Sequence, residues 1–299
     1  MNGSCRYDMT FFKGEREMLH TLTYTVPEDN LTIDAILQEK WKLGKKLIHD
    51  LRMQKAVTNT NGELLQWKLP NKKGDVLVFK WEGESSNYLP SDQIPLYVAY
   101  EDEYLLIASK PRGVATHPNE TGQNHTMMNT VMHYLTSKGH HYGEHVHRID
   151  EGTKGLIVIA KNPIVKGMLD RQLENKEIVR TYEAIVEGQV KNNHGTIRAA
   201  IGNDRHHPTR RRVSPTGQLA ITHYEVVGRH EQFTKVHAIL ETGRTHQIRV
   251  HFAHLGNPIV GDDLYGAKRT PTKTYELHAF KVQFVHPITG EMLVVEDKK

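Results

Sequence analysis

The spacing of hydrophobic positions changes along the chain, and its first part predicts helices followed by a hairpin. From Leu31 to Gln54 apolar residues recur three and four positions apart, which predicts helix, and Gly44 divides this stretch into two helices. Residues 56–81 then alternate as strands do. Asn61-Gly62 favours a tight hairpin turn, and Lys73-Gly74-Asp75 supplies a second turn. The pattern predicts a small α/β unit.

The second part of the chain has a different pattern, with many strands and few helices. Residues 95–110 predict two strands joined at an Asp/Glu turn, Ile157–Ala160 predicts a buried strand, and helices are expected over 124–137 and 162–173. Further half-buried strands are predicted by the alternating segments TYEAIVEGQV, TIRAAIG, AITHYEVVGRH, FTKVHAILETG and LHAFKVQFVHP. This content predicts an α+β fold with a mixed, mostly antiparallel sheet.

A change in composition separates the two parts. Residues 83–93, GESSNYLPSDQ, are small and polar and include a proline, which is typical of a linker. We therefore predict a small domain over residues 16–82, a linker over 83–94 and a large domain over 95–299.

Composition restricts the class of protein. No apolar run reaches the roughly 18–20 residues that a membrane helix needs, and the N-terminus lacks the apolar core of a secretory signal. Cys5 is the single cysteine, which excludes an internal disulfide and fits a reducing cytosol. We expect a cytoplasmic protein without a membrane partner, and a monomer, because no apolar heptad pattern occurs.

Positive charge is local, since the formal net charge is only +4. Residues 205–212, RHHPTRRR, carry four arginines and two histidines, and residues 40–55 carry seven basic side chains against one acid. One such run can be an ordinary solvated face. Two runs favour nucleic-acid binding. In the second run we predict RNA contacts for Lys45, Lys46 and Arg52.

Several common catalytic patterns are missing from the sequence. Gly44-Lys45-Lys46 lacks the hydroxyl residue that ends a phosphate-binding loop, and no Gly-x-Ser-x-Gly elbow occurs. His230-Glu231 begins a zinc-protease pattern, but Thr234 stands where the second histidine is needed. We therefore do not expect metal catalysis.

Two segments carry the candidate chemistry, HRIDEGTKGL at 147–156 and ETGRTHQIRVHFAHLG at 241–256. The first presents Asp150 beside His147 and Arg148, in a loop before an apolar run. An isolated aspartate is more often a helix cap or a salt-bridge partner than a nucleophile. A nearby arginine favours the ionised form of a carboxyl group, and Arg249 is the best candidate for that role.

The second segment alternates basic with apolar and small residues, which predicts a strand that carries Arg249. Its basic positions are Arg244, His246, Arg249, His251 and His254.

These segments resemble the signatures of the RluA-type pseudouridine synthases. HRIDEGTKGL is similar to the aspartate signature, and TGRTHQIRVHFAHLGNPIVGDDLYG is similar to the second signature. SKPRGVATHP, TYEAIVEG and LHAFKVQFVHPITGE resemble three further motifs in the same order. The resemblance covers residues 95–295. Residues 16–82 resemble a ribosomal-protein-S-four-like RNA-binding domain with a degenerate hairpin.

The resemblance implies an RNA uridine isomerase that needs no cofactor or metal. Asp150 would attack the target nucleotide, Arg249 would hold Asp150 ionised, and Tyr182 would stack on the uracil. Arg148 would enter the RNA stack that the base leaves. Lys154 stands where the family usually has a small hydroxyl residue.

Other basic residues are assigned to RNA contacts around the site. These are His147, Arg244, His246 and Lys110. Large-subunit ribosomal RNA is the favoured substrate, and transfer RNA is an alternative. A non-catalytic RNA-binding protein or ribosome assembly factor is a third reading.

Overall fold

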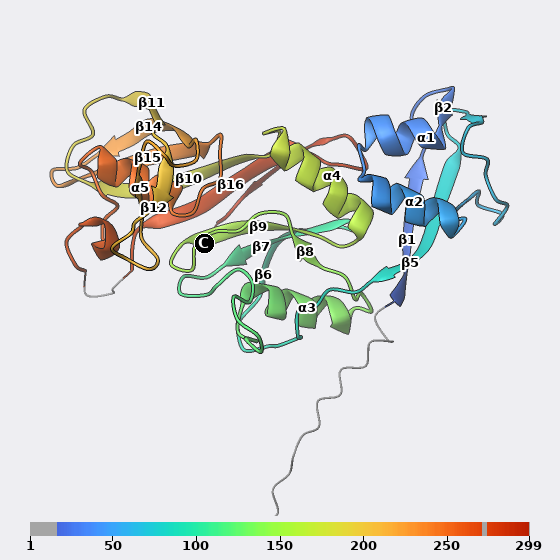
Figure 1. Cartoon of the computed structure of the whole chain (residues 1–299), viewed down its shortest axis with the longest axis horizontal. Helices are drawn as coiled ribbons and strands as arrows, with labels where there is room; N and C mark the ends of the chain where they lie inside the picture. The colour runs from blue at the N-terminus through green and yellow to red at the C-terminus, as the bar shows by residue number, and fades with distance from the viewer. Residues whose placement is uncertain (1–16, 271–273, 299) are drawn as a thin grey trace, which may run out of the picture. The chain divides into compact units, whose positions relative to one another are not determined.

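The computed structural model describes residues 17–270 and 274–298 (Figure 1). They fall into two compact units, which divide between Asn87 and Tyr88. Within the described part of the chain, no helix has the length and apolar character that a membrane crossing requires.

The N-terminal unit combines a small antiparallel sheet with short helices. The sheet has the order β1-β5-β3, and β2 pairs separately with β4. The elements are β1 (Glu17–Thr25), β2 (Leu31–Thr32), α1 (Ile33–Ala35), a π-helical turn η1 (Ile36–Lys40), α2 (Lys45–Met53), β3 (Val57–Thr58), β4 (Pro70–Asn71) and β5 (Val76–Glu84). Gly44 caps the N-terminus of α2, so the predicted division into two helical segments is confirmed.

Both predicted turns of this unit are confirmed. Gly62 and Gly74 have positive φ angles of 83° and 90°, which favour glycine. The Asn59 side-chain oxygen accepts hydrogen bonds from the backbone N–H groups of Asn61 and Glu63, at 2.9 and 3.0 Å, and so stabilises the first turn.

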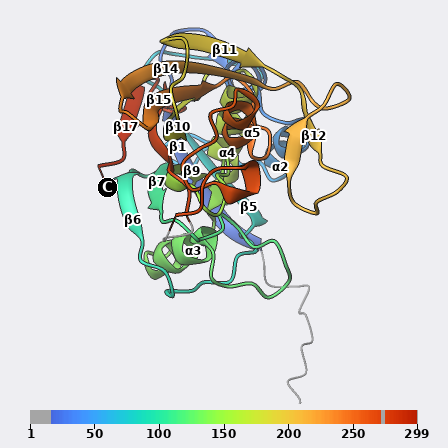
Figure 2. The same cartoon turned by 90° about the vertical axis from the view of Figure 1, so that its left-hand side faces the viewer.

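The C-terminal unit is built on a ten-stranded sheet (Figures 1 and 2). Its strands are β6 (Tyr97–Glu101), β7 (Leu105–Lys110), β8 (Glu144–His145), β9 (Lys154–Ala160), β10 (Val179–Glu187), β11 (His194–Arg198), β14 (Ile221–Arg229), β15 (Phe233–Leu240), β16 (Leu277–Val285) and β17 (Met292–Glu296). The main order is β11-β14-β15-β10-β16-β9-β7-β6, while β17 pairs with β16 and β8 with β9. Among the pairings described, β9 and β16 run parallel and the others antiparallel, so the predicted mixed sheet is confirmed.

Helices α3 (Met127–Ser137) and α4 (Pro163–Glu174) lie where the sequence predicts them. In Figure 1, α4 lies above β9, and α3 lies below β6 and β7. Each helix begins at a side-chain cap. Thr126 and Asn129 form a capping box for α3, and the Asn162 side chain accepts from the Val165 N–H at 2.9 Å.

The predicted basic strand over 241–256 is wrong, because this segment forms helix α5 (Gln247–His254). His246, at a φ of 58°, turns the chain into the helix. Residues 247–252 are all buried, so their polar members do not form a solvated strand face. His251 instead bonds the Thr222 hydroxyl at 2.9 Å and the Ala199 carbonyl at 3.0 Å. Arg249 therefore projects from a buried helix.

The segment between the two units is partly held by α3. β5 continues to Glu84, two residues into the predicted linker. Ser91 donates its N–H to the Asn129 carbonyl, and the Asn129 side chain donates to the Leu89 carbonyl at 2.8 Å. The exact domain limits stay a prediction.

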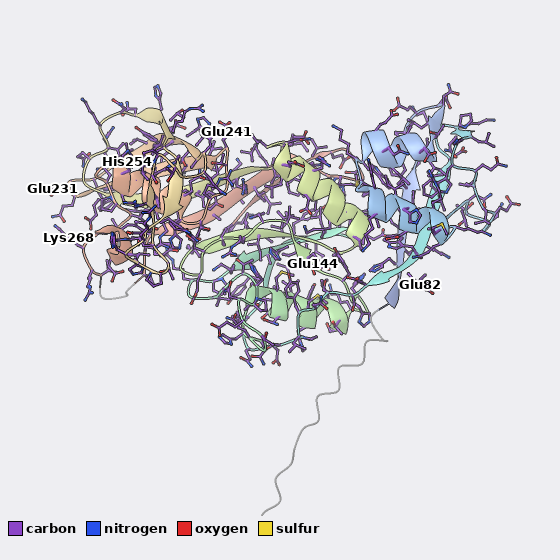
Figure 3. The ribbon with its side chains drawn as sticks, viewed as in Figure 1. Glu82, Glu144, Glu231, Glu241, His254 and Lys268 are labelled. Atoms are coloured by element: carbon purple, nitrogen blue, oxygen red, sulfur yellow. The ribbon has the colours of Figure 1, made fainter. Side chains whose placement is uncertain are left out.

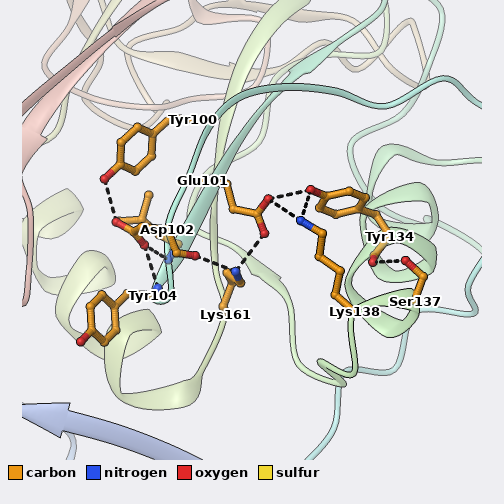
Figure 4. A network of polar contacts seen from close by, with 9 residues as sticks. Tyr100, Glu101, Asp102, Tyr104, Tyr134, Ser137, Lys138 and Lys161 are labelled. Atoms are coloured by element: carbon orange, nitrogen blue, oxygen red, sulfur yellow. Dashed lines mark hydrogen bonds and ion pairs between the residues drawn. The ribbon is translucent and has the colours of Figure 1, made fainter.

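A network of polar contacts joins the turn between β6 and β7 to its surroundings (Figure 4). The buried Lys161 ammonium donates to Glu101 at 3.0 Å and to the Asp102 carbonyl at 2.6 Å. The Asp102 carboxylate bonds Tyr100, the backbone of Tyr104, and His286 at 2.9 Å. The turn that starts β7 is therefore fixed by ionised carboxylates.

This network predicts a loss of stability in acid. Burial acts to raise the pKa of Asp102, but the hydrogen bonds from His286, Leu105, Tyr100 and Tyr104 outweigh it and lower that pKa to about 2. A carboxyl group whose pKa is lowered in the folded protein stabilises the fold at pH values above its ordinary pKa. This contribution is lost as the pH falls from ~5 towards ~2. Asp102→Asn should therefore have a lower melting temperature than the wild type at pH 7. In strong acid the two melting temperatures should become equal. A difference that is constant across a pH series of thermal melts would contradict the prediction.

Candidate active site

A pocket of about 670 Å³ opens between the loop before β9, strand β10, and the segment from the end of β15 into α5. Asp150, Tyr182 and Arg249 all line it, although they are far apart in the sequence. The remaining lining residues used below are His147, Arg148, Glu174, Lys176, Arg180, Glu241, Gly243, Arg244 and His246.

Asp150 lies in the loop that leads into the fully buried strand β9. Its backbone carbonyl accepts from the Thr153 N–H at 3.0 Å, which closes a turn over Glu151 and Gly152. The Asp150 side chain is 21% exposed, and its Oδ2 lies 3.6 Å from a terminal nitrogen of Arg249. The carboxylate therefore faces both the pocket and a cation.

Arg249 has a closer partner than Asp150. Its guanidinium donates two parallel hydrogen bonds to Asp262, at 2.7 and 2.8 Å, and the Asp262 side chain is 1% exposed. Burial acts to lower the pKa of Arg249, but Asp262, Tyr275 and Asp150 together raise it above its usual range. Arg249 is thus held as a cation by Asp262, a residue that the sequence analysis did not select. The GDDLYG end of the second signature contains it.

Two tyrosine rings enclose the Arg249 guanidinium, with centroids 5.0 Å away at Tyr265 and 4.3 Å away at Tyr275. The Tyr275 hydroxyl also lies 3.2 Å from the Thr153 hydroxyl, which links it to the Asp150 loop. A Cβ at Gly152 would come within 2.6 Å of the Tyr275 ring. The loop can therefore pack on this ring only because residue 152 is glycine.

Tyr182 lies on the buried face of β10 and belongs to both the core and the pocket. Burial raises the pKa of its hydroxyl, Arg180 opposes this rise and Asp150 adds to it. At neutral pH Tyr182 is therefore a neutral ring with a hydroxyl group.

Lys110 does not support the predicted RNA contact, because its exposure is 0%. Its ammonium group donates to the carbonyls of Pro111 at 3.0 Å, Val114 at 2.6 Å and Glu151 at 3.0 Å. Burial lowers the pKa of Lys110 to about 7, while Asp150 and Glu151 act to raise it. Lys110 therefore ties the segment after β7 to the residue beside Asp150.

Lys110→Met should weaken both the fold and the site. Three partly buried carbonyl oxygens would lose their donor, and an unsatisfied buried group costs about 1–3 kcal/mol. We expect the free energy of unfolding to fall by roughly 3 kcal/mol or more, with a reduced turnover number. Urea unfolding checks the first effect, and the exposed Lys191→Met is the matched control. Unchanged stability in Lys110→Met would show that these contacts contribute nothing.

His147 is also buried, at 6% exposure, so a surface contact with RNA is not supported. Its Nε2 accepts from the Val158 N–H at 3.3 Å. Burial lowers the pKa of His147 to about 3, and Arg180 and His145 lower it further, so the ring is neutral at pH 7.

The other predicted contacts around the pocket lie at its rim. Arg148 and Arg244 are exposed. His246 is half-buried, and its Nδ1 lies 2.8 Å from the Tyr265 hydroxyl. The same hydroxyl accepts from the Arg211 N–H at 2.9 Å. This contact attaches the arginine-rich hairpin of β12 (Ile201–Asn203) and β13 (Arg211–Val213) to the site.

In the N-terminal unit, Lys45 and Lys46 are exposed at the start of α2. Arg52 is partly occupied within the unit. It donates to Asp34 at 2.5 Å and lies 4.7 Å from the centre of the Trp67 ring.

The site thus presents one carboxylate beside a locked cation and an aromatic ring, in a pocket with basic residues at its rim. This arrangement is suited to an enzyme that works on a single RNA base inside a pocket.

Comparison with known proteins agrees. Residues 104–254 match the family described as RNA pseudouridylate synthase, and residues 20–77 match the RluD ribosomal pseudouridine synthase N-terminal domain. The RNA pseudouridine synthase YhcT of Bacillus subtilis is 44% identical over 90% of this chain and 90% of its own length.

Ribosomal large subunit pseudouridine synthase D of Escherichia coli O157:H7 is 33% identical over 90% of this chain and 88% of its own. A solved structure of human RNA pseudouridylate synthase domain containing 1 shares the fold, with a TM-score of 0.57 and 22% identity over 70% of this chain and 86% of that chain. The chain belongs to the RNA pseudouridine synthases of the RluA/RluD type, so it is an isomerase that acts on RNA.

Proposed function

We propose that this enzyme converts uridine to pseudouridine in large-subunit ribosomal RNA, with Asp150 as the nucleophile. The observation that carries the proposal is the position of the Asp150 carboxylate, which lines the pocket 3.6 Å from a guanidinium that Asp262 already holds.

The reaction needs a nucleophile that forms and then releases a covalent bond. Asp150 attacks either the uracil ring or the anomeric carbon of the ribose. The bond between N1 and the ribose breaks, the base turns, and a bond from C5 to the ribose replaces it. The proton leaves C5, N1 gains one, and Asp150 departs unchanged, so the atoms balance without a co-reactant.

The side chains around Asp150 suit the separate tasks of this reaction. Arg249 supplies positive charge beside the attacking carboxylate. Tyr182 presents a neutral ring for stacking on the uracil, and its hydroxyl can assist proton removal from C5. Arg148, exposed two residues before Asp150, fills the space that the extruded base leaves in the RNA.

The choice of ribosomal RNA rests on the relatives. Several of them carry the name ribosomal large subunit pseudouridine synthase D, at 32–37% identity. The exposed Lys45 and Lys46 on α2 are suited to phosphate contacts, so the N-terminal unit would add affinity for RNA.

Mapping of pseudouridine in RNA from cells with and without the gene tests the substrate. Carbodiimide labelling followed by reverse transcription marks each pseudouridine. We expect one or more marks in large-subunit ribosomal RNA to vanish with the gene and to return when the purified protein is added. Loss of marks in transfer RNA alone would replace the proposed substrate, and no loss anywhere would favour a non-catalytic RNA-binding protein.

A further inference from the structure

Arg180 is a buried cation of the pocket, and no described carboxylate pairs with it. It lies on β10 two residues before Tyr182 and on the same buried face of the strand. The residue is 9% exposed, and its Nε is buried without a hydrogen-bond partner. Among the described residues, no ion pair involves Arg180, whereas the neighbouring cation Lys176 is paired with Glu241 at 2.6 Å.

His147 is a neutral residue of the same pocket and supplies no anion to Arg180. Because its Nε2 accepts a hydrogen bond from the Val158 N–H, that nitrogen carries no proton. A neutral ring must then hold its proton on Nδ1, and this buried Nδ1 has no partner. Arg180 lies close enough to both rings for its charge to act on them: after burial, it adds to the lowering of the pKa of His147, and it opposes the rise in the pKa of Tyr182.

The acidic residues of the pocket face other cations. Glu174 is paired with Arg171 at 2.5 Å, and Glu241 is paired with Lys176 and lies 3.1 Å from His223. Figure 3 labels Glu241, which directly follows β15. Asp150 faces Arg249. In the described parts of the chain, none of these carboxylates therefore forms an ion pair with Arg180.

Open space adjoins the Arg180 guanidinium on the side of Gly243. A Cβ built at Gly243 would lie 3.6 Å from the Arg180 Nη1, and no other non-neighbouring atom would come within 4 Å of it. A planar guanidinium that faces such a space can bind the oxygens of a phosphate with two parallel hydrogen bonds.

The position of Arg180 relative to Tyr182 indicates which phosphate of the RNA it would bind. Two positions along a strand separate the Cα atoms by about 7 Å. Arg180 therefore enters the pocket from the position next to the ring that would stack on the uracil, on the same face of β10. An uncompensated buried charge is costly, and such a cost persists in a protein where it serves a ligand.

We propose that Arg180 binds one phosphodiester group of the RNA strand adjacent to the extruded uridine. This proposal rests on the proposed function and adds a specific anion subsite to it. The buried charge is neutralised only when the RNA strand is seated, which couples entry of the nucleotide to formation of the ion pair.

Arg180→Gln tests the role of the charge, with the exposed Arg198→Gln on β11 as the matched control. Removal of an unpaired buried charge should leave the melting temperature unchanged or raise it. Affinity for pentauridylate, measured by fluorescence anisotropy at low salt, should fall roughly 10- to 100-fold. The slope of log affinity against log salt should become shallower by about 0.7, as for the loss of one phosphate contact on a single strand.

Neutral linkages in the RNA identify the contacted group. Each phosphodiester of pentauridylate is replaced in turn by a methylphosphonate. One linkage should weaken binding to the wild type and have no further effect on Arg180→Gln, because the two changes remove the same contact. Gly243→Val, which fills the adjoining space and keeps the arginine, should reproduce the loss at that linkage.

Three results would overturn the subsite. One is a lower melting temperature with unchanged RNA affinity, which would make Arg180 structural. Another is that Arg180→Gln binds RNA more weakly but responds to each methylphosphonate linkage as the wild type does. This result would indicate that Arg180 contacts a base. The third is normal binding by Gly243→Val. These binding measurements need no turnover, so an enzyme inactive on ribosomal RNA would contradict the proposed function and leave the subsite standing.

Discussion

Replacement of Asp150 by asparagine is expected to abolish pseudouridine formation while RNA still binds. Asparagine keeps the shape of the side chain and removes the oxygen nucleophile, so no covalent intermediate can form. Loss of a nucleophile costs on the order of 10⁴-fold or more in turnover. RNA affinity should change little, because the Asp150 carboxylate is an anionic hydrogen-bond acceptor. It repels phosphates and so does not hold the RNA.

The measurement is single-turnover isomerisation at saturating enzyme, together with RNA affinity. Asp170→Asn, an exposed carboxylate on α4 paired with Lys166, is the control and should match the wild type. Substantial turnover by Asp150→Asn would contradict the assignment of the nucleophile. Lost RNA binding would mean that the variant disturbs the site as a whole.

Asp262→Asn is expected to impair both stability and turnover, although Asp262 is not expected to touch the reacting atoms. The buried Arg249 would lose its bidentate carboxylate partner and retain only the 3.6 Å contact with Asp150. Removal of one partner of a buried pair typically costs about 3–5 kcal/mol. Arg249 should then turn towards Asp150 and displace it, and a misplacement of this kind can cost roughly 100-fold in rate.

Asp263→Asn provides the matched control, because Asp263 is adjacent and its side chain is 61% exposed. Both variants are assayed well below the melting temperature of Asp262→Asn. The positioning role predicts a lower turnover number at unchanged RNA affinity. A stable Asp262→Asn variant with normal turnover would show that Arg249 does not need this partner.

The sequence pattern identified most elements of the large sheet and the helices α3 and α4. Alternation is informative there because one face of each strand packs on the core, as in β10, where every second residue is buried. Asn162-Pro163 is equally informative, because a side-chain cap and a proline at the first position mark the start of a helix.

Helix α5 could not be predicted in this way. Its buried face includes Gln247, Arg249 and His251, whose partners come from other segments of the chain. The spacing of apolar residues gives no information about buried polar groups whose hydrogen-bond partners lie on other segments of the chain. The same reason explains the assignments of Lys110 and His147, since charge in the sequence suggests exposure and only the fold reveals the burial.

The candidate site was predictable in part. Asp150, Tyr182 and Arg249 follow from the motifs that the chain shares with its family, and all three line one pocket. Asp262, Tyr275 and Arg180 were not selected, because their contribution depends on distances to residues far away in the sequence. Arg180 in particular is distinguished by the absence of a carboxylate partner in the described structure, which no sequence pattern can express.

Release of tritium from RNA labelled at C5 of uridine tests the central claim most directly. Ribosomal and transfer RNA from cells that lack this protein are each incubated with the purified enzyme. We predict release from ribosomal RNA, none from transfer RNA, and none with Asp150→Asn. No release from either RNA, with RNA binding intact, would contradict catalysis by this site.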